Sequence, residues 1–357
     1  MIHVTKTFLP PQEEYNAILK RAWDNGWLTN RGELVLELES KLKDFLGVKN
    51  VIAMTNGTLP IQIAIKALGL KGEIITTPFS YVATTSSILW EGCTPVFVDI
   101  HPEYLTIDET KIEAAITEHT SGILATHVYG NPCNVEVIEQ IAKKHNLKVI
   151  YDAAHCFGVQ YKGQSIFTYG DISTCSFHAT KIFHTGEGGA AFCNGNTYDS
   201  VYYRHNFGHI NQVEYQEIGI NAKMSELQAA MGLAVMEYIP EIIKSRREIV
   251  ERYKSEIFIG RTFKLRAHTL RNAAYFPLIL DDAEQLLAIV DTLNKYKIFP
   301  RRYFFPSLNN LFGLGNQSCP VSKSIADRVL CLPLYHDLDR NNQDLIIELI
   351  NKSTKNG

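Results

Sequence analysis

The sequence predicts an α/β protein with a large domain built on a mostly parallel sheet and a smaller α+β domain at the C-terminus. Short apolar runs alternate with helix-like segments from about residue 50 to 195, a pattern typical of βαβ units. A further strand-like run and a further helical segment follow after residue 270. The chain has 357 residues, whereas single hydrophobic cores stop growing at about 250–300 residues. We therefore expect two domains.

Seven apolar runs are expected to form the strands of the large sheet. Turn residues such as Gly170-Asp171 and Gly188-Gly189 separate them from their neighbours. The first and last runs suit edge or antiparallel positions as well as parallel ones. In chain order the runs cover residues 51–55, 73–77, 95–99, 122–126, 148–151, 172–176 and 189–193.

The C-terminal third of the chain has a different pattern. Residues 221 to about 253 suit one long helix that connects the domains, with a kink at Pro240, because proline removes a helical hydrogen bond. Residues 275–280 predict a strand and residues 283–296 a helix. We therefore place the large domain at residues 1–240 and the small domain at residues 241–357.

Composition argues against several classes of partner. The chain has 35 basic and 38 acidic residues, a formal net charge of -3, and no long basic block, so a nucleic-acid partner is not expected. Its seven cysteines contain no C-x-x-C pair, which argues against a zinc site or a disulfide framework. His178 and His184 are six residues apart, which fits no usual helical metal pair. We expect no metal.

No membrane segment is expected either. The first residues contain no apolar run of the kind found in signal peptides. No stretch approaches the roughly 20 apolar residues that span a bilayer. We therefore expect a cytoplasmic protein.

Three segments of the predicted sheet region carry candidate chemistry. Lys181 follows Ser176 by five residues on a turn between two strand-like runs, and a lysine with a lowered pKa can form a Schiff base with an aldehyde. Asp152 ends another run, where a carboxylate can pair with a pyridinium nitrogen or cap a helix. Gly57 and Thr58 open a helical segment, whose amides and dipole attract phosphate. Together these groups suit pyridoxal phosphate.

Two sequence signatures carry a family resemblance. Ser-Phe-His-Ala-Thr-Lys followed closely by Glu-Gly-Gly at residues 176–189, and Gly-Ile-Asn-Ala-Lys-Met-Ser-Glu-Leu-Gln at residues 219–228, resemble the DegT-type nucleotide-sugar aminotransferases. This family belongs to the fold-type I group of pyridoxal phosphate enzymes. The resemblance runs from about residue 26 to 335 and implies a seven-stranded sheet. Asn56 departs from it, because the family usually has serine there.

The resemblance implies roles for individual residues. Lys181 would bind the cofactor aldehyde and then move a proton between the amino donor and the cofactor. Asp152 would keep the pyridine nitrogen protonated. His155 would lie beside the 3-hydroxyl, or be a packing histidine. Tyr81 would stack on the ring, with Phe79 as a nearby core aromatic.

The resemblance also implies a shared phosphate site. The backbone of Gly57 and Thr58 and the hydroxyls of Thr58 and Ser176 would hold the phosphate, and Asn221 would reach in from the neighbouring subunit. An obligate homodimer with shared active sites follows. The alternative for each segment is a plain turn or a helix cap.

The substrates are implied by the same resemblance. They are L-glutamate as amino donor and a nucleotide-linked keto sugar as acceptor. The His-Ala-Thr-Lys form around Lys181 favours a 4-keto-6-deoxyhexose, with conversion of dTDP-4-dehydro-6-deoxy-D-glucose to dTDP-4-amino-4,6-dideoxy-D-glucose. Such products serve surface polysaccharides, including the O-antigen of lipopolysaccharide. A 3-keto sugar, a GDP-perosamine-type substrate or a UDP-sugar remains an alternative.

Three other classes of protein fit the sequence less well. The family's dehydratases carry histidine where this chain has Lys181. A non-catalytic regulator would have no physical need for lysine, aspartate and phosphate site together. A Rossmann-type dehydrogenase needs G-x-G-x-x-G after its first strand, which residues 56–60 do not supply.

Overall fold

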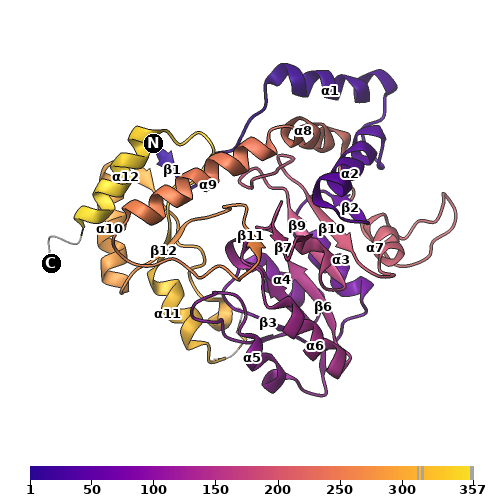
Figure 1. Cartoon of the computed structure of the whole chain (residues 1–357). Helices are drawn as coiled ribbons and strands as arrows, with labels where there is room; N and C mark the ends of the chain where they lie inside the picture. Colours follow the sequence, from indigo (N-terminus) through magenta and orange to yellow (C-terminus); the bar gives the residue numbers. More distant parts are fainter. Residues whose placement is uncertain (312, 315–316, 354–357) are drawn as a thin grey trace.

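The computed structural model describes residues 1–311, 313–314 and 317–353, and within them seven strands form a central sheet (Figure 1). The strand order is β2-β10-β9-β6-β5-β3-β4. β10 runs antiparallel to both β2 and β9, and the other pairs are parallel. The predicted α/β fold is confirmed. The strands are β2 (Val51–Met54), β3 (Glu73–Thr76), β4 (Thr94–Phe97), β5 (Thr120–Thr126), β6 (Lys148–Asp152), β9 (Ile172–Ser176) and β10 (Gly189–Cys193).

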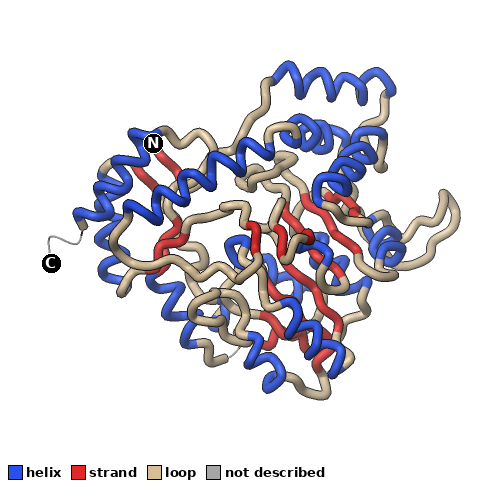
Figure 2. Tube along the Cα trace, in the orientation of Figure 1, coloured by secondary structure: helices blue, strands red, loops and turns tan. Residues whose placement is uncertain are grey.

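Helices cover both faces of this sheet (Figure 2). Alternate residues of a strand enter different cores: Ile150 packs in the core that contains α3, α4 and α7, whereas Val149 and Tyr151 pack in the core that contains α2, α6 and α8. Burial on both faces explains why consecutive positions such as 149–151 are apolar. The helices are α1 (Gln12–Asn25), α2 (Glu33–Leu46), α3 (Leu59–Ala67), α4 (Val82–Trp90), α5 (Glu109–Ile112), α6 (Val135–His145), α7 (Tyr198–His205) and α8 (Glu226–Met236).

A second core lies in the C-terminal part of the chain. It is formed largely by residues 249–350, and Ile2 joins it because β1 pairs in parallel with β13. The division near residue 240 stays a prediction, to which the structure adds this N-terminal strand. The remaining elements are β1 (Ile2–His3), β7 (Gln160–Tyr161), β8 (Gln164–Ser165), α9 (Ile239–Glu256), β11 (Thr269–Leu270), β12 (Pro277–Ile279), α10 (Ala283–Lys295), β13 (Ile298–Phe299), α11 (Pro320–Arg328), β14 (Val329–Cys331) and α12 (Arg340–Lys352).

The prediction of one long helix that begins at residue 221 is wrong. The structure has two helices, α8 and α9, and Pro240 lies in the first turn of α9, where its missing N–H costs nothing. Ser225 begins α8 with a capping box, in which its hydroxyl accepts from the Gln228 N–H at 3.3 Å. Before that cap, Lys223 forms an antiparallel bridge with Met54 instead of a helical turn.

The remaining expectations for the C-terminal part are met in outline. The predicted strand at residues 275–280 is shorter, and the predicted helix at 283–296 is α10. Among the helices of the described residues, none is long and apolar enough to cross a membrane.

The sheet topology brings the loops after six strands to one edge. Strands β3, β4, β5, β6 and β9 are parallel, and β2 points the same way because β10 is antiparallel to both β2 and β9. Their carboxyl ends therefore meet at one edge, where open α/β sheets bind ligands.

Candidate active site

Asp152 is the last residue of β6, and its side chain is buried at this edge. One carboxylate oxygen, Oδ2, accepts the Thr84 hydroxyl at 2.6 Å, and Oδ1 accepts the Ala154 N–H at 3.1 Å. Burial raises the pKa of Asp152, whereas these two hydrogen bonds and the charge of Lys181 oppose that rise. The carboxylate is therefore fixed by donors on two sides.

Lys181 lies on the turn that follows β9. Its backbone N–H donates to the His178 carbonyl at 2.8 Å, which closes the turn. Burial lowers the pKa of the Lys181 amine, and the negative charge of Asp152 partly opposes this. The phenols of Tyr81 and Tyr303 also partly oppose this lowering of the pKa of Lys181. A lysine in this setting is more readily deprotonated than one at the surface.

His155 is held as a neutral ring. Its Nδ1 accepts the Tyr129 backbone N–H at 3.2 Å, so we assign the ring proton to Nε2. Burial and the positive charge of Lys181 hold the pKa of His155 well below its ordinary range. The ring lies against Tyr275 at 4.8 Å and parallel to Phe304 at 5.7 Å. His155 can therefore donate one hydrogen bond from Nε2 and cannot easily accept a proton.

Tyr129 reaches His155 from an unusual backbone conformation. Its φ is +57°, in the left-handed region, and the next residue, Gly130, has φ +79°. A side chain on Gly130 would lie 2.9 Å from Oδ1 of Asn272. The Tyr129 hydroxyl donates to the Tyr303 carbonyl. This turn is fixed by tertiary contacts on both sides.

Asn272 connects a later segment to the same place. Its Nδ2 donates to the carbonyls of His155 and Phe157, both at 2.9 Å, and its Oδ1 accepts the Ala274 N–H at 3.0 Å. The hydrogen bond from Asn272 therefore fixes the backbone of His155, while Tyr275 and Phe304 pack against its ring.

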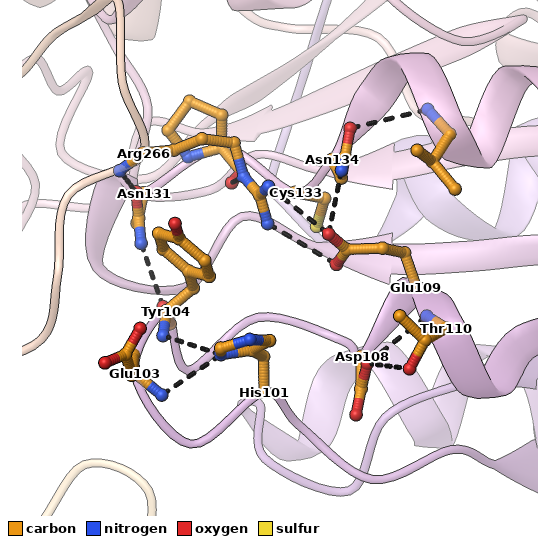
Figure 3. A network of polar contacts seen from close by, with 12 residues as sticks. His101, Glu103, Tyr104, Asp108, Glu109, Thr110, Asn131, Cys133, Asn134 and Arg266 are labelled. Carbon is orange, nitrogen blue, oxygen red and sulfur yellow. Dashed lines mark hydrogen bonds and ion pairs between the residues drawn. The ribbon is translucent and has the colours of Figure 1, made fainter.

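A polar network anchors the segment that leads to Asn272 (Figure 3). The guanidinium of Arg266 pairs with Glu109 at 3.3 Å and lies over the Tyr104 ring at 4.4 Å from the ring centroid. Asn131 donates to the carbonyls of Tyr104 and Lys264, at 2.8 and 3.0 Å, and accepts the Arg266 N–H at 2.9 Å. The network ties residues 264–266 to Tyr104, Glu109 and Asn131.

We expect Arg266→Met to lower the free energy of unfolding by about 3 kcal/mol, because it leaves Glu109 buried without its cation. Urea denaturation measures the change. The matched control is Lys143→Met, which breaks the exposed pair with Glu139 and should cost less than about 1 kcal/mol. Equal effects of the two substitutions would contradict an anchoring role for Arg266.

The predicted phosphate segments are adjacent. A Cβ on Gly57 would lie 2.7 Å from the Cβ of Ser176, so the two loops touch and only glycine fits. However, Oδ1 of Asn56 accepts the N–H groups of Thr58 and Leu59, both at 2.9 Å. The N–H groups at the start of α3 therefore converge on the Asn56 oxygen. An anion bound at this point would accept these two hydrogen bonds in place of Asn56.

The two aromatic candidates differ in exposure. Phe79 is fully buried, in edge contact with Tyr129 and Phe304. Tyr81 is 61% exposed and immediately precedes α4. It lines a cleft of about 510 Å³ together with Arg301 and other residues of the 300–306 segment. Of the two rings, Tyr81 is therefore the one available to a ligand.

Asn221 lies at the surface of the subunit. Its side chain accepts from Lys223 Nζ at 2.8 Å, and the next residue, Ala222, accepts the Thr55 N–H at 2.9 Å. It therefore lies close in the chain to the loop after β2, with its side chain facing outward. Of the other histidines that flank Lys181, His184 bonds through Nε2 to the Phe8 carbonyl at 2.7 Å, which is a packing role.

Sequence reasoning missed three residues of this site: Thr84, Tyr129 and Asn272. Thr84 lies three residues after Tyr81, which is one helical turn, and this spacing was the available signal. Tyr129 and Asn272 contact His155 from distant parts of the chain. No local pattern indicates them.

Comparison with known proteins agrees with this geometry. The family model of the DegT/DnrJ/EryC1/StrS aminotransferases matches residues 11–351. The dTDP-4-amino-4,6-dideoxy-D-glucose transaminase of Shigella dysenteriae is 41% identical over 98% of each chain, and the GDP-perosamine synthase of Escherichia coli O157:H7 is 32% identical over 92% of each. The solved structure of DesI in the presence of its TDP-sugar product superposes with a TM-score of 0.93 at 30% identity, covering 99% of this chain and 93% of that one. The chain therefore belongs to the DegT/DnrJ/EryC1/StrS family of sugar aminotransferases, which depend on pyridoxal phosphate.

Proposed function

We propose that the protein transfers the amino group of L-glutamate to dTDP-4-dehydro-6-deoxy-D-glucose, giving dTDP-4-amino-4,6-dideoxy-D-glucose for a surface polysaccharide such as O-antigen. The supporting observation is the placement of a partly buried lysine and a buried carboxylate at one sheet edge, in a chain 41% identical to a transaminase named for this product. The GDP-perosamine synthase relative, at 32% identity, keeps a GDP-linked acceptor as the second candidate.

The described residues fit pyridoxal phosphate. The amides of Thr58 and Leu59 already converge on an acceptor, the Asn56 oxygen, and Gly57 in the same loop touches Ser176. This suits a phosphate group at the start of a helix. Asp152 lies at the neighbouring strand end and suits the ring nitrogen.

The remaining side chains of the site suit the chemistry of the cofactor and the binding of the acceptor. When bound, pyridoxal phosphate supplies an aldehyde conjugated to an electron-withdrawing pyridinium ring. Lys181 would hold that aldehyde covalently and, once released, would carry the proton from the donor α-carbon. Its lowered pKa makes the neutral amine accessible. His155 would donate from Nε2 to the 3-oxygen, and Tyr81 would cover the ring. Arg301, exposed on the cleft beside Tyr81, suits the diphosphate of the acceptor.

The direct test is a two-step reaction. Purified protein loaded with pyridoxal phosphate should lose its visible absorption band on addition of L-glutamate, and regain it on addition of dTDP-4-dehydro-6-deoxy-D-glucose. Mass spectrometry and NMR should then identify the 4-amino sugar. A band lost with glutamate but not restored by this sugar, and restored by the GDP-linked 4-keto sugar, would move the proposal to the second acceptor.

We also propose a homodimer whose two active sites are shared. The loop of residues 207–220 projects from the subunit near α7 (Figure 1). Its exposed apolar side chains are Phe207, Ile210, Val213, Tyr215, Ile218 and Ile220. A surface of this kind is typical of a protein interface. Asn221 follows it directly and would reach the phosphate of the partner.

Mixing two inactive variants tests this arrangement. Lys181→Ala and Asn221→Asp should each be nearly inactive, the second because an added carboxylate repels the phosphate. After subunit exchange, a mixed dimer has one intact site, with Lys181 from one subunit and Asn221 from the other. We expect about a quarter of wild-type activity to return, as statistical mixing of two-fold dimers requires. Activity no greater than the sum of the unmixed variants would contradict the shared site.

A further inference from the structure

Thr84 contacts Asp152 from a different element of the fold. It lies in the first turn of α4, fully buried, and its Oγ1 is 2.6 Å from Oδ2 of Asp152 at the end of β6. This length is typical of a hydroxyl that donates to a charged carboxylate. Its own backbone N–H donates to the Tyr81 carbonyl at 3.2 Å, so the turn that carries the hydroxyl is closed.

The two donors to Asp152 each occupy one lone pair of its carboxylate. Thr84 occupies a lone pair of Oδ2 and the Ala154 N–H occupies a lone pair of Oδ1. Each carboxylate oxygen retains a second lone pair. A carboxylate held at both oxygens cannot rotate freely about its Cβ–Cγ bond, so its remaining lone pairs keep a constant direction.

We propose that Thr84 is a positioning residue, whose hydroxyl holds the Asp152 carboxylate in the orientation in which it meets the ring nitrogen of pyridoxal phosphate. The proposal rests on the role given to Asp152 above. Tyr81, the residue proposed to cover the ring, immediately precedes α4 and lies three positions before Thr84. The start of α4 would thus set both a face contact of the ring and, through Asp152, its nitrogen contact.

The electrostatic surroundings support this role. The ionisable groups near Asp152 are Lys181, on the turn after β9, and the thiols of Cys156 and Cys175. Burial raises the pKa of Asp152, and the Thr84 hydrogen bond is the strongest of the influences that lower it. Without the hydroxyl, the Asp152 carboxylate would be a stronger base and would itself hold the proton that lies between it and the ring nitrogen, so that the ring nitrogen would be left unprotonated.

Thr84→Val tests the proposal, because it removes the hydroxyl and keeps the shape of the side chain. The chain offers a matched control in Thr85→Val: Thr85 is the next residue of α4, is equally buried, and its hydroxyl has no hydrogen-bond partner among the described residues. The readout is the ¹⁵N resonance of ring-labelled pyridoxal phosphate in each reconstituted protein.

In Thr84→Val, we expect this resonance to move toward that of an unprotonated pyridine, while Thr85→Val matches the wild type. We also expect kcat to fall roughly 10- to 100-fold, as for loss of a hydrogen bond to a charged group, with the KM for the sugar unchanged. Thr84→Ser keeps the hydroxyl and should restore both values.

Two results would overturn the proposal. One is a ring resonance and kcat in Thr84→Val that match those of Thr85→Val. If Thr84→Val does not fold, the comparison passes to Thr84→Ser and Thr84→Ala, and equal ring resonances in these two are the second such result. Asp152→Asn separates the two levels of the argument. A ring nitrogen that stays protonated in that variant overturns the role of Asp152 itself, whereas its loss there, with no change in Thr84→Val, removes only the role of Thr84.

Discussion

Replacing Lys181 with alanine is expected to reduce amino transfer by about a thousandfold or more, and to abolish the visible absorption band of the lysine-bound cofactor. The neighbouring histidine cannot take its place, because His155 accepts at Nδ1 and carries its proton on Nε2. Asp152 is engaged with Thr84 and Ala154. The amine is therefore both the covalent anchor and the group that moves the proton. Absorbance after reconstitution, and turnover measured from the sugar product, test the two roles together.

Two further substitutions make this test specific. Lys181→Arg keeps a positive charge but supplies no neutral amine near pH 7, so it should be as inactive as Lys181→Ala. Lys162→Ala removes a lysine that is exposed and paired with Glu136, and it should retain wild-type turnover. A visible band of normal intensity in Lys181→Ala would show that another amine binds the cofactor.

The strands of the large sheet could be predicted because burial on both faces demands continuous apolar runs. Ile150 points into one core and its neighbours Val149 and Tyr151 point into the other, so these three consecutive positions are all apolar. The helix predicted from residue 221 failed for a local reason. Residues 221–225 suit a helix by composition, yet Lys223 pairs with Met54 across the end of β2, a contact that depends on tertiary structure.

The residues of the site likewise fall into those that the sequence indicates and those that depend on tertiary structure. Lys181, Asp152 and Gly57 could be named because each lies at the end of an apolar run or within five residues after it, and parallel strands bring their ends together. The hydrogen bond between Thr84 and Asp152 joins residues 68 positions apart, and depends on how α4 lies across the sheet edge. Asn56 likewise accepts the amides of Thr58 and Leu59 with its side chain, whereas the groups expected from this loop were the backbone of Gly57 and Thr58 and the Thr58 hydroxyl.

Asp152→Asn is the second substitution with a large expected effect. It preserves the shape of the side chain, and its Oδ1 can still accept a hydrogen bond, but the negative charge is lost. We expect kcat to fall on the order of a thousandfold or more, or several kcal/mol of transition-state stabilisation, because the ring nitrogen no longer keeps its proton. The visible band should persist, since Lys181 is intact. Asp171→Asn is the control. Asp171 accepts the Val149 N–H at 2.8 Å at the amino ends of the parallel strands, away from the site. Loss of its charge should leave kcat nearly unchanged.

The pH dependence of the Asp152→Asn variant distinguishes loss of the proton from loss of the fold around it. Acidification protonates the ring nitrogen without help from a carboxylate, so the ratio of variant to wild-type kcat should rise as the pH falls. Lys181 is present in both proteins, and the effect of pH on its amine largely cancels in that ratio. A ratio that is low and independent of pH would mean that Asp152 matters for the shape of the site. Near-normal turnover would mean that the ring nitrogen has another partner.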